Sequence, residues 1–114
     1  KSARKLKGLY SARRIVDKDG IYSADVVLVP LEDGDRTFAL KKAKKKVITF
    51  DLNPLSRTAQ TADITIVDNT TRAMKLLVTA CKKKKAKPSY NNKKVLSESI
   101  SEIRKNLQRR AKLA

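Results

Sequence analysis

Residues 24–69 read ADVVLVPLEDGDRTFALKKAKKKVITFDLNPLSRTAQTADITIVDN. Three short runs in this stretch, 26–29, 47–50 and 64–67, are rich in β-branched residues and favour β-strands. Uninterrupted apolar runs of this kind are typical of parallel strands that are covered on both faces. Crossover connections of this length are right-handed in nearly all known cases, and the strand–helix–strand order here therefore predicts a parallel sheet. The stretch therefore predicts a short parallel sheet with polar loops at its strand ends.

Apolar residues at helical spacing predict three helices, near 36–45, 70–82 and 95–111. We expect Asn69 or Thr70 to cap the second helix. The clearest stripe lies in the last helix and consists of Leu96, Ile100, Ile103 and Leu107. Together these elements predict one α/β domain over residues 1–114, a Rossmann-like three-layer fold with a short parallel sheet flanked by helices. Within it, residues 1–15 are expected to form a loosely ordered basic arm.

The strand ends carry the candidate site, because ligands of open α/β sheets bind outside the carboxyl ends of the strands. Asp51 ends the second strand, where a carboxylate can accept two hydrogen bonds from a ribose diol. The loop 32–37 opens a helix whose free N–H groups suit a phosphate, with Asp35 as cap and Gly34 as a point of close approach. The glycine patterns of dinucleotide sites and P-loops are absent.

A plainer interpretation applies to the same residues. Asp33 and Asp35 are typical helix caps, and Asn53 followed by Pro54 is a typical turn. Each residue taken singly fits this structural interpretation better than a functional one. The convergence of two polar loops at one edge of a sheet favours a ligand site.

Three strings resemble the C-terminal half of archaeal 4-phosphopantoate:β-alanine ligase, also called phosphopantothenate synthetase. They are residues 24–37, 51–59 and 62–69, and the likeness runs from about residue 16 to the end of the chain, including 90–92. The resemblance implies an ATP-dependent, AMP-forming ligase that joins 4-phosphopantoate to β-alanine in coenzyme A biosynthesis and works as a homodimer. It also implies an N-terminal half that supplies part of the active site, so we expect this chain to be incomplete.

The strand ends and the resemblance together predict the residues that bind ATP. These are Glu32, Asp33, Gly34, Asp35, Arg36, Thr37, Asp51, Leu52 and Asn53. The carboxylates would hold ribose hydroxyls or Mg²⁺, which prefers oxygen ligands together with substrate phosphates, and Arg36 would neutralise phosphate. No catalytic residue is assigned, since the chain has no His and an acyl adenylate forms mainly through positioning and charge stabilisation.

The charge of the chain supports a second functional hypothesis. Its 114 residues include 28 Lys and Arg against 11 Asp and Glu, a net charge of +17 that is typical of partners of nucleic acid or phosphorylated ligands. The lysine runs 41–46 and 82–87 fit either solvated helix ends or RNA and DNA contacts. Only five aromatic residues are present and none alternates with basic ones, which disfavours a nucleic-acid-binding module. Arg13 and Arg14 remain candidate anion contacts.

A third hypothesis is a structural subunit that pairs with a separately encoded N-terminal half. One cysteine, Cys81, excludes an intrachain disulfide, and the absence of His excludes the usual zinc sets. We expect Cys81 and Met74 to be packed side chains. No apolar run is long enough to span a membrane, so the expectation is a cytoplasmic protein without membrane contact.

Overall fold

The computed structural model describes residues 3–7, 15–83 and 90–113. Its centre is a three-stranded sheet in the order β3 (Val26–Val29), β4 (Lys46–Phe50) and β5 (Ile64–Ile66). Both strand pairs are parallel, with Val27 opposite Val47 and Thr49 opposite Thr65. The positions of the three strands and their parallel direction confirm the sequence prediction.

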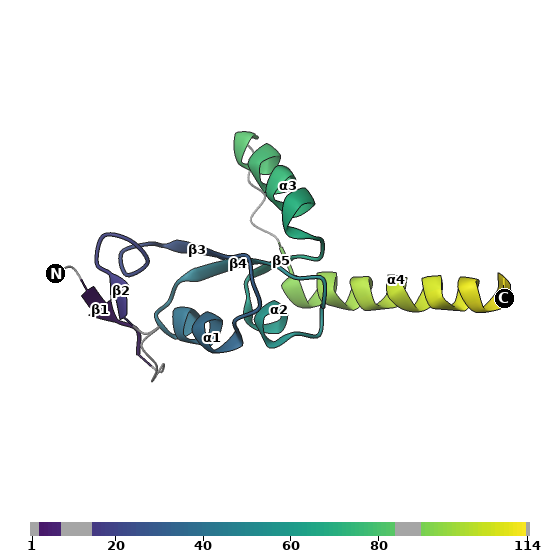
Figure 1. Ribbon diagram of the computed structural model, residues 1–114, viewed down its shortest axis with the longest axis horizontal. Coiled ribbons are helices and arrows are strands. Elements are labelled where there is room, and N and C mark those ends of the chain that lie inside the picture. Colours follow the sequence, from purple (N-terminus) through teal and green to yellow (C-terminus); the bar gives the residue numbers. More distant parts are fainter. Residues whose placement is uncertain (1–2, 8–14, 84–89, 114) are drawn as a thin grey trace.

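The helices flank this sheet, as the sequence predicted. In chain order they are α1 (Gly34–Lys42), α2 (Arg57–Thr61), α3 (Thr70–Lys82) and α4 (Asn92–Leu113). The first two form the crossovers and lie together on one face of the sheet (Figure 1). Asn69 caps α3 through a hydrogen bond from the Arg72 N–H, which agrees with the expectation. The short helix α2 was not predicted, because five residues are too few to show a helical period.

An antiparallel hairpin lies at the amino end of the sheet (Figure 1). It consists of β1 (Ala3–Lys5) and β2 (Ile15–Asp17). Leu6 and Val16 are 3% and 6% exposed and belong to the core, so this part of the expected loose arm is anchored. The candidate anion contacts Arg13 and Arg14 lie outside the described residues.

The two faces of the sheet differ in how well they are covered. Val29, Val47 and Thr49 are buried on the face that α1 and α2 cover. On the opposite face Val26 is 54% exposed and Ile48 is only half-buried. The apolar runs predict a sheet that is covered on both faces. Within the described residues, the second face is only partly covered.

The helices α3 and α4 project from the body of the domain (Figure 1). Met74 and Cys81 are exposed on α3, so the expectation that both are packed is wrong for this chain. Leu96 is the buried residue of α4, whereas Ile103 and Leu107 are 48% and 62% exposed. Helical periodicity identifies an apolar face but not what covers it. No helix of the described residues is long and apolar enough to cross a membrane.

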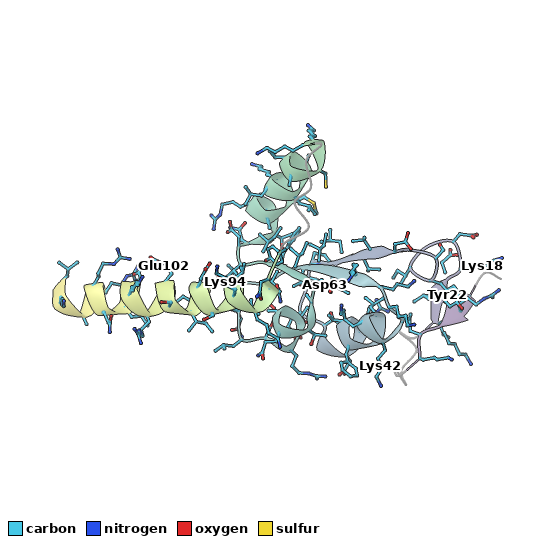
Figure 2. The ribbon with its side chains drawn as sticks, turned by 180° about the vertical axis from the view of Figure 1, so that it is seen from behind. Lys18, Tyr22, Lys42, Asp63, Lys94 and Glu102 are labelled. Atoms are coloured by element: carbon cyan, nitrogen blue, oxygen red, sulfur yellow. The ribbon has the colours of Figure 1, made fainter. Side chains whose placement is uncertain are left out.

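Asp63 joins the starts of β4 and β5 to helix α1 (Figure 2). Its carboxylate accepts hydrogen bonds from Lys41 Nζ at 2.5 Å and from the Val47 N–H at 2.8 Å. Burial alone would raise the pKa of Asp63, but these two hydrogen bonds and the positive charges of Lys41 and Lys46 hold it below its usual value.

Replacing Asp63 should therefore destabilise the fold in a pH-dependent way. Asp63→Asn is expected to lower the free energy of unfolding by about 1–3 kcal/mol at neutral pH, because it removes the charge from a partly buried hydrogen-bonded pair. The pKa of Asp63 is lower in the folded than in the unfolded chain, so its contribution is complete above the unfolded pKa and is lost as pH falls through the folded pKa.

Urea unfolding at neutral pH and at about pH 3 measures this difference. The gap between wild type and Asp63→Asn should shrink in acid. Asp19→Asn, a change at an exposed turn, is the matched control and should leave stability unchanged. A gap of the same size at both pH values would contradict the assignment.

Candidate functional site

Three polar loops lie together at the carboxyl edge of the sheet. They are 30–33 after β3, 51–56 after β4 and 67–69 after β5. Because the three strands are parallel, their carboxyl ends share one edge, which is where ligands of open α/β sheets bind. The third loop was not among the predicted site residues, although the same rule places it there.

The first loop is held by the side chain of Thr58, the second residue of α2. The Thr58 hydroxyl accepts a hydrogen bond from the Asp33 N–H at 2.8 Å and donates one to Glu32 Oε1 at 3.0 Å. Thr58 is fully buried, so these hydrogen bonds fix the loop against α2. Asp33 then caps α1 by accepting a hydrogen bond from the Arg36 N–H at 3.1 Å. The cap is thus Asp33, and the expectation that Asp35 is the cap is wrong.

Gly34 allows α1 and α2 to approach closely. A Cβ atom at this position would lie 2.8 Å from the Cβ of Arg57, which is closer than real Cβ contacts. The neighbour that Gly34 admits is thus Arg57, and the close approach of a phosphate to this residue stays a prediction. The guanidinium of Arg57 forms an ion pair with Asp35 at 2.9 Å, and both side chains are well exposed. An exposed pair of this kind is weak and can exchange partners.

Asp51 organises the second loop. Its Oδ1 accepts a hydrogen bond from the Asn53 N–H at 2.9 Å, and its Oδ2 accepts one from the Ser56 hydroxyl. Ser56 in turn caps α2 by accepting a hydrogen bond from the Ala59 N–H at 2.9 Å. The start of α2 therefore joins the two predicted loops, one through Ser56 and the other through Thr58.

The third loop places Asp68 beside the other two, and Arg72 of α3 forms an ion pair with it at 2.7 Å. Asp68 accepts hydrogen bonds from Arg72 Nε at 2.8 Å and from the Asn69 N–H at 2.7 Å. The Arg72 guanidinium and the Asn69 N–H hold the pKa of Asp68 below its usual range, so this carboxylate is ionised. Asp68 follows a predicted parallel strand, and this position alone could have identified it as a candidate site residue from the sequence.

The predicted site residues differ in accessibility. Glu32, Asp35, Leu52 and Asn53 are exposed at the edge, and Asp33, Arg36 and Asp51 are half-buried. Thr37 is a fully buried residue of α1, so its side chain is not accessible at this edge. Leu52 is 67% exposed beside Asn53, and Leu31 in the first loop is 72% exposed. The edge thus combines carboxylates with exposed apolar side chains, a mixture that suits a nucleoside.

Residues just before and at the start of α4 form hydrogen bonds with β5 and α2. The Tyr90 hydroxyl donates a hydrogen bond to the Thr65 carbonyl at 3.1 Å, and Asn92 Nδ2 donates one to the Ala59 carbonyl at 2.9 Å. Burial raises the pKa of the Tyr90 hydroxyl, so it remains a donor at neutral pH. These contacts connect 90–92, which share in the family resemblance, to β5 and α2.

The described part of the chain contains no group of three or more His, Cys, Asp or Glu side chains placed to hold a metal. Carboxylate oxygens are nevertheless available at the edge from Glu32, Asp35 and Asp51. Mg²⁺ in phosphate-transfer sites is commonly held by one or two carboxylates, with substrate phosphates and water completing the coordination. The oxygen donors present fit that pattern.

Comparisons with known proteins agree with one another. The family model for phosphopantothenate/pantothenate synthetase matches residues 1–108. The chain is 51% identical over 105 residues to the 4-phosphopantoate–β-alanine ligase of Methanosarcina mazei, which covers 84% of this chain and 42% of that protein. It is 48% identical over 117 residues to the enzyme of the same name from Thermococcus kodakarensis, covering 95% of this chain and 45% of that protein. The chain spans less than half the length of these relatives, and on this evidence it belongs to the phosphopantothenate/pantothenate synthetase family.

Proposed function

We propose that this chain is part of an ATP-dependent ligase that joins 4-phosphopantoate to β-alanine and yields 4′-phosphopantothenate, AMP and pyrophosphate in coenzyme A biosynthesis. The observation that carries the proposal is the family match over residues 1–108. The loops at the carboxyl edge support it, because they offer a place for the nucleotide. The chain covers less than half of each of these relatives, and we propose that the remainder of such a protein supplies the rest of the site.

Asp51 is the proposed ribose ligand. A carboxylate has about four lone-pair directions, and the loop uses two of them for Asn53 and Ser56. Two directions remain for the two hydroxyl groups of a ribose. Because the loop bonds hold the carboxylate in place before a ligand arrives, ordering it costs little on binding. The exposed side chain of Leu52 next to it offers apolar contact to the base.

The phosphates are proposed to lie at the start of α1. The helix N-terminus carries a partial positive charge, and Arg36 and Arg57 add two guanidinium groups beside it. Arg57 is paired with Asp35 only through an exposed contact, so a phosphate can replace that carboxylate. We propose that Mg²⁺ joins the phosphates to Glu32 or Asp35, since nearby carboxylates would otherwise repel them.

The chemistry requires positioning more than proton transfer. The carboxylate of 4-phosphopantoate attacks the α-phosphorus of ATP, the bond to pyrophosphate breaks, and an acyl adenylate forms. The amine of β-alanine then attacks the acyl carbon, and AMP leaves as the amide bond forms. Fixed positive charge stabilises both transition states, which is consistent with a site that has arginines and no His.

Removal of the Asp51 carboxylate tests the nucleotide site. In the full-length enzyme, Asp51→Ala should weaken ATP binding by at least about tenfold, because it removes up to two charge-assisted hydrogen bonds to ribose. Titration calorimetry of ATP against both proteins measures the change. NADH serves as the control ligand and should not bind.

Asp19→Ala is the matched control, since it removes a carboxylate from an exposed turn at the amino end of the sheet. It should leave ATP affinity unchanged. ATP affinity that stays the same in a folded Asp51→Ala protein would remove Asp51 from the site. Tight NADH binding without ATP binding would overturn the nucleotide assignment.

We also propose that the protein is a homodimer. Much apolar surface remains in water on the less covered face of the sheet, on α3 and along the stripe of α4. The stripe residues Ile100, Ile103 and Leu107 are spaced by three and four positions, as in a helix-pairing seam. A second copy would cover this seam.

Charges placed in the α4 seam should weaken self-association. Ile103→Glu with Leu107→Glu is expected to raise the dimer dissociation constant by at least about tenfold, because a carboxylate buried in an apolar seam is costly. Sedimentation equilibrium of the full-length protein measures this. Ser101→Glu with Gln108→Glu adds the same charge outside the stripe and should leave the dimer intact. A wild-type monomer at micromolar concentration would contradict the proposal.

A further inference from the structure

A second concave surface lies at the amino end of the sheet, away from the loops of the carboxyl edge. It is a cavity of about 340 Å³ between the β1–β2 hairpin, the turn before β3 and the end of α1. Its lining includes Lys5, Leu6, Lys7, Tyr22, Lys42 and Lys45. Figure 2 shows Tyr22 and Lys42 at this end of the molecule and Glu102 at the other.

The lining of this cavity is strongly basic. Four lysines line it and no carboxylate does. Within the described residues, the ammonium groups of Lys5 and Lys7 have no hydrogen-bond or ion-pair partner. The Lys45 ammonium is fixed, because it donates to the Tyr22 carbonyl at 2.8 Å and to the Ala24 carbonyl at 2.7 Å. One of its three N–H groups remains for a ligand.

The helix dipole explains only part of this charge. Cations at the C-terminal end of a helix complement its carbonyl groups, which accounts for Lys42 in the last turn of α1. Lys45 lies beyond that helix, and the Tyr22 and Ala24 carbonyls hold its ammonium group. Lys5 and Lys7 belong to the hairpin segment, so the dipole of α1 does not account for them. Leu6 between them is 3% exposed and anchors this segment in the core. The fold therefore brings two separate pairs of lysines to one cavity.

We propose that this cavity binds the phosphate groups of a small phosphorylated molecule. Several ammonium groups around one concavity repel one another, and a multivalent anion removes that repulsion while accepting their hydrogen bonds. The volume lies in the range of small-molecule sites, about 300–1,000 Å³. A nucleic acid backbone would instead need basic residues spread along an extended groove.

The test uses pyrophosphate as the probe and the full-length protein. Acetic anhydride labels accessible lysines, and mass spectrometry reports which of them the probe protects. Protection of Lys5 and Lys7, with none at Lys105 and Lys112 on exposed α4, is the expected result. In calorimetry, Lys5→Gln with Lys7→Gln should weaken pyrophosphate binding by about tenfold or more. Lys105→Gln with Lys112→Gln removes the same charge and should have no effect.

The experiment also separates this site from the proposed nucleotide site, because Arg57→Gln removes a proposed phosphate contact at the carboxyl edge and should leave pyrophosphate binding in the cavity unchanged. Binding that is lost in Arg57→Gln but kept in Lys5→Gln with Lys7→Gln would place the anion at the carboxyl edge and overturn the proposal. Equal weakening in both double lysine variants would also overturn it, in favour of diffuse attraction by net charge. Absence of protection at Lys5 and Lys7 in the wild type decides against the site even where a variant fails to fold.

Discussion

Buried threonine hydroxyls are the constraint on which the carboxyl edge depends. Thr49 Oγ1 donates to the Val29 carbonyl at 2.6 Å, and Thr65 Oγ1 donates to the Ala59 carbonyl at 3.0 Å. Thr58 holds the first loop in the same way. A buried hydroxyl without a partner costs about 1–3 kcal/mol, so each of these groups favours the one arrangement that satisfies it. The threonines thus align the end of each strand with the element beside it.

The short helix α2 shows how far the site depends on such contacts. A helix of five residues has no stability of its own in water, because nucleation is not repaid by so few hydrogen bonds. Its position comes from Ser56 as cap, from Thr58 in the core and from the contact of Arg57 with Gly34. Since α2 joins both predicted loops, any ligand site at this edge depends on tertiary contacts between residues about 25 positions apart.

Local patterns explain which features could be predicted from the sequence. The strand 26–29 and the helix 70–82 were predicted with their observed bounds, because apolar runs and helical spacing are properties of neighbouring residues. The role of Thr58 could not be predicted, because it depends on where α2 lies relative to α1. The cap at Asp33 is a local contact with the Arg36 N–H, and it was among the structural roles that the sequence suggested. The prediction that Met74 is packed is wrong for another reason. Helical periodicity in 70–82 identifies an apolar face, but the described residues do not cover Met74 on that face.

The distribution of charge bears on how an anionic ligand could be held. The chain carries +17, yet Glu32, Asp35 and Asp51 lie at the carboxyl edge. Lysines elsewhere would attract the proposed nucleotide from a distance, but salt screens exposed charges beyond about 8–10 Å. At contact distance the carboxylates of the edge repel a phosphate, because unit charges 4 Å apart interact by about 4 kcal/mol near a protein surface. A polyphosphate can therefore bind here only with a cation between it and the carboxylates, or with Arg57 released from Asp35. The acidic edge therefore favours the magnesium complex that we propose for ATP, whereas the phosphate site that we propose in the lysine-lined cavity needs no metal.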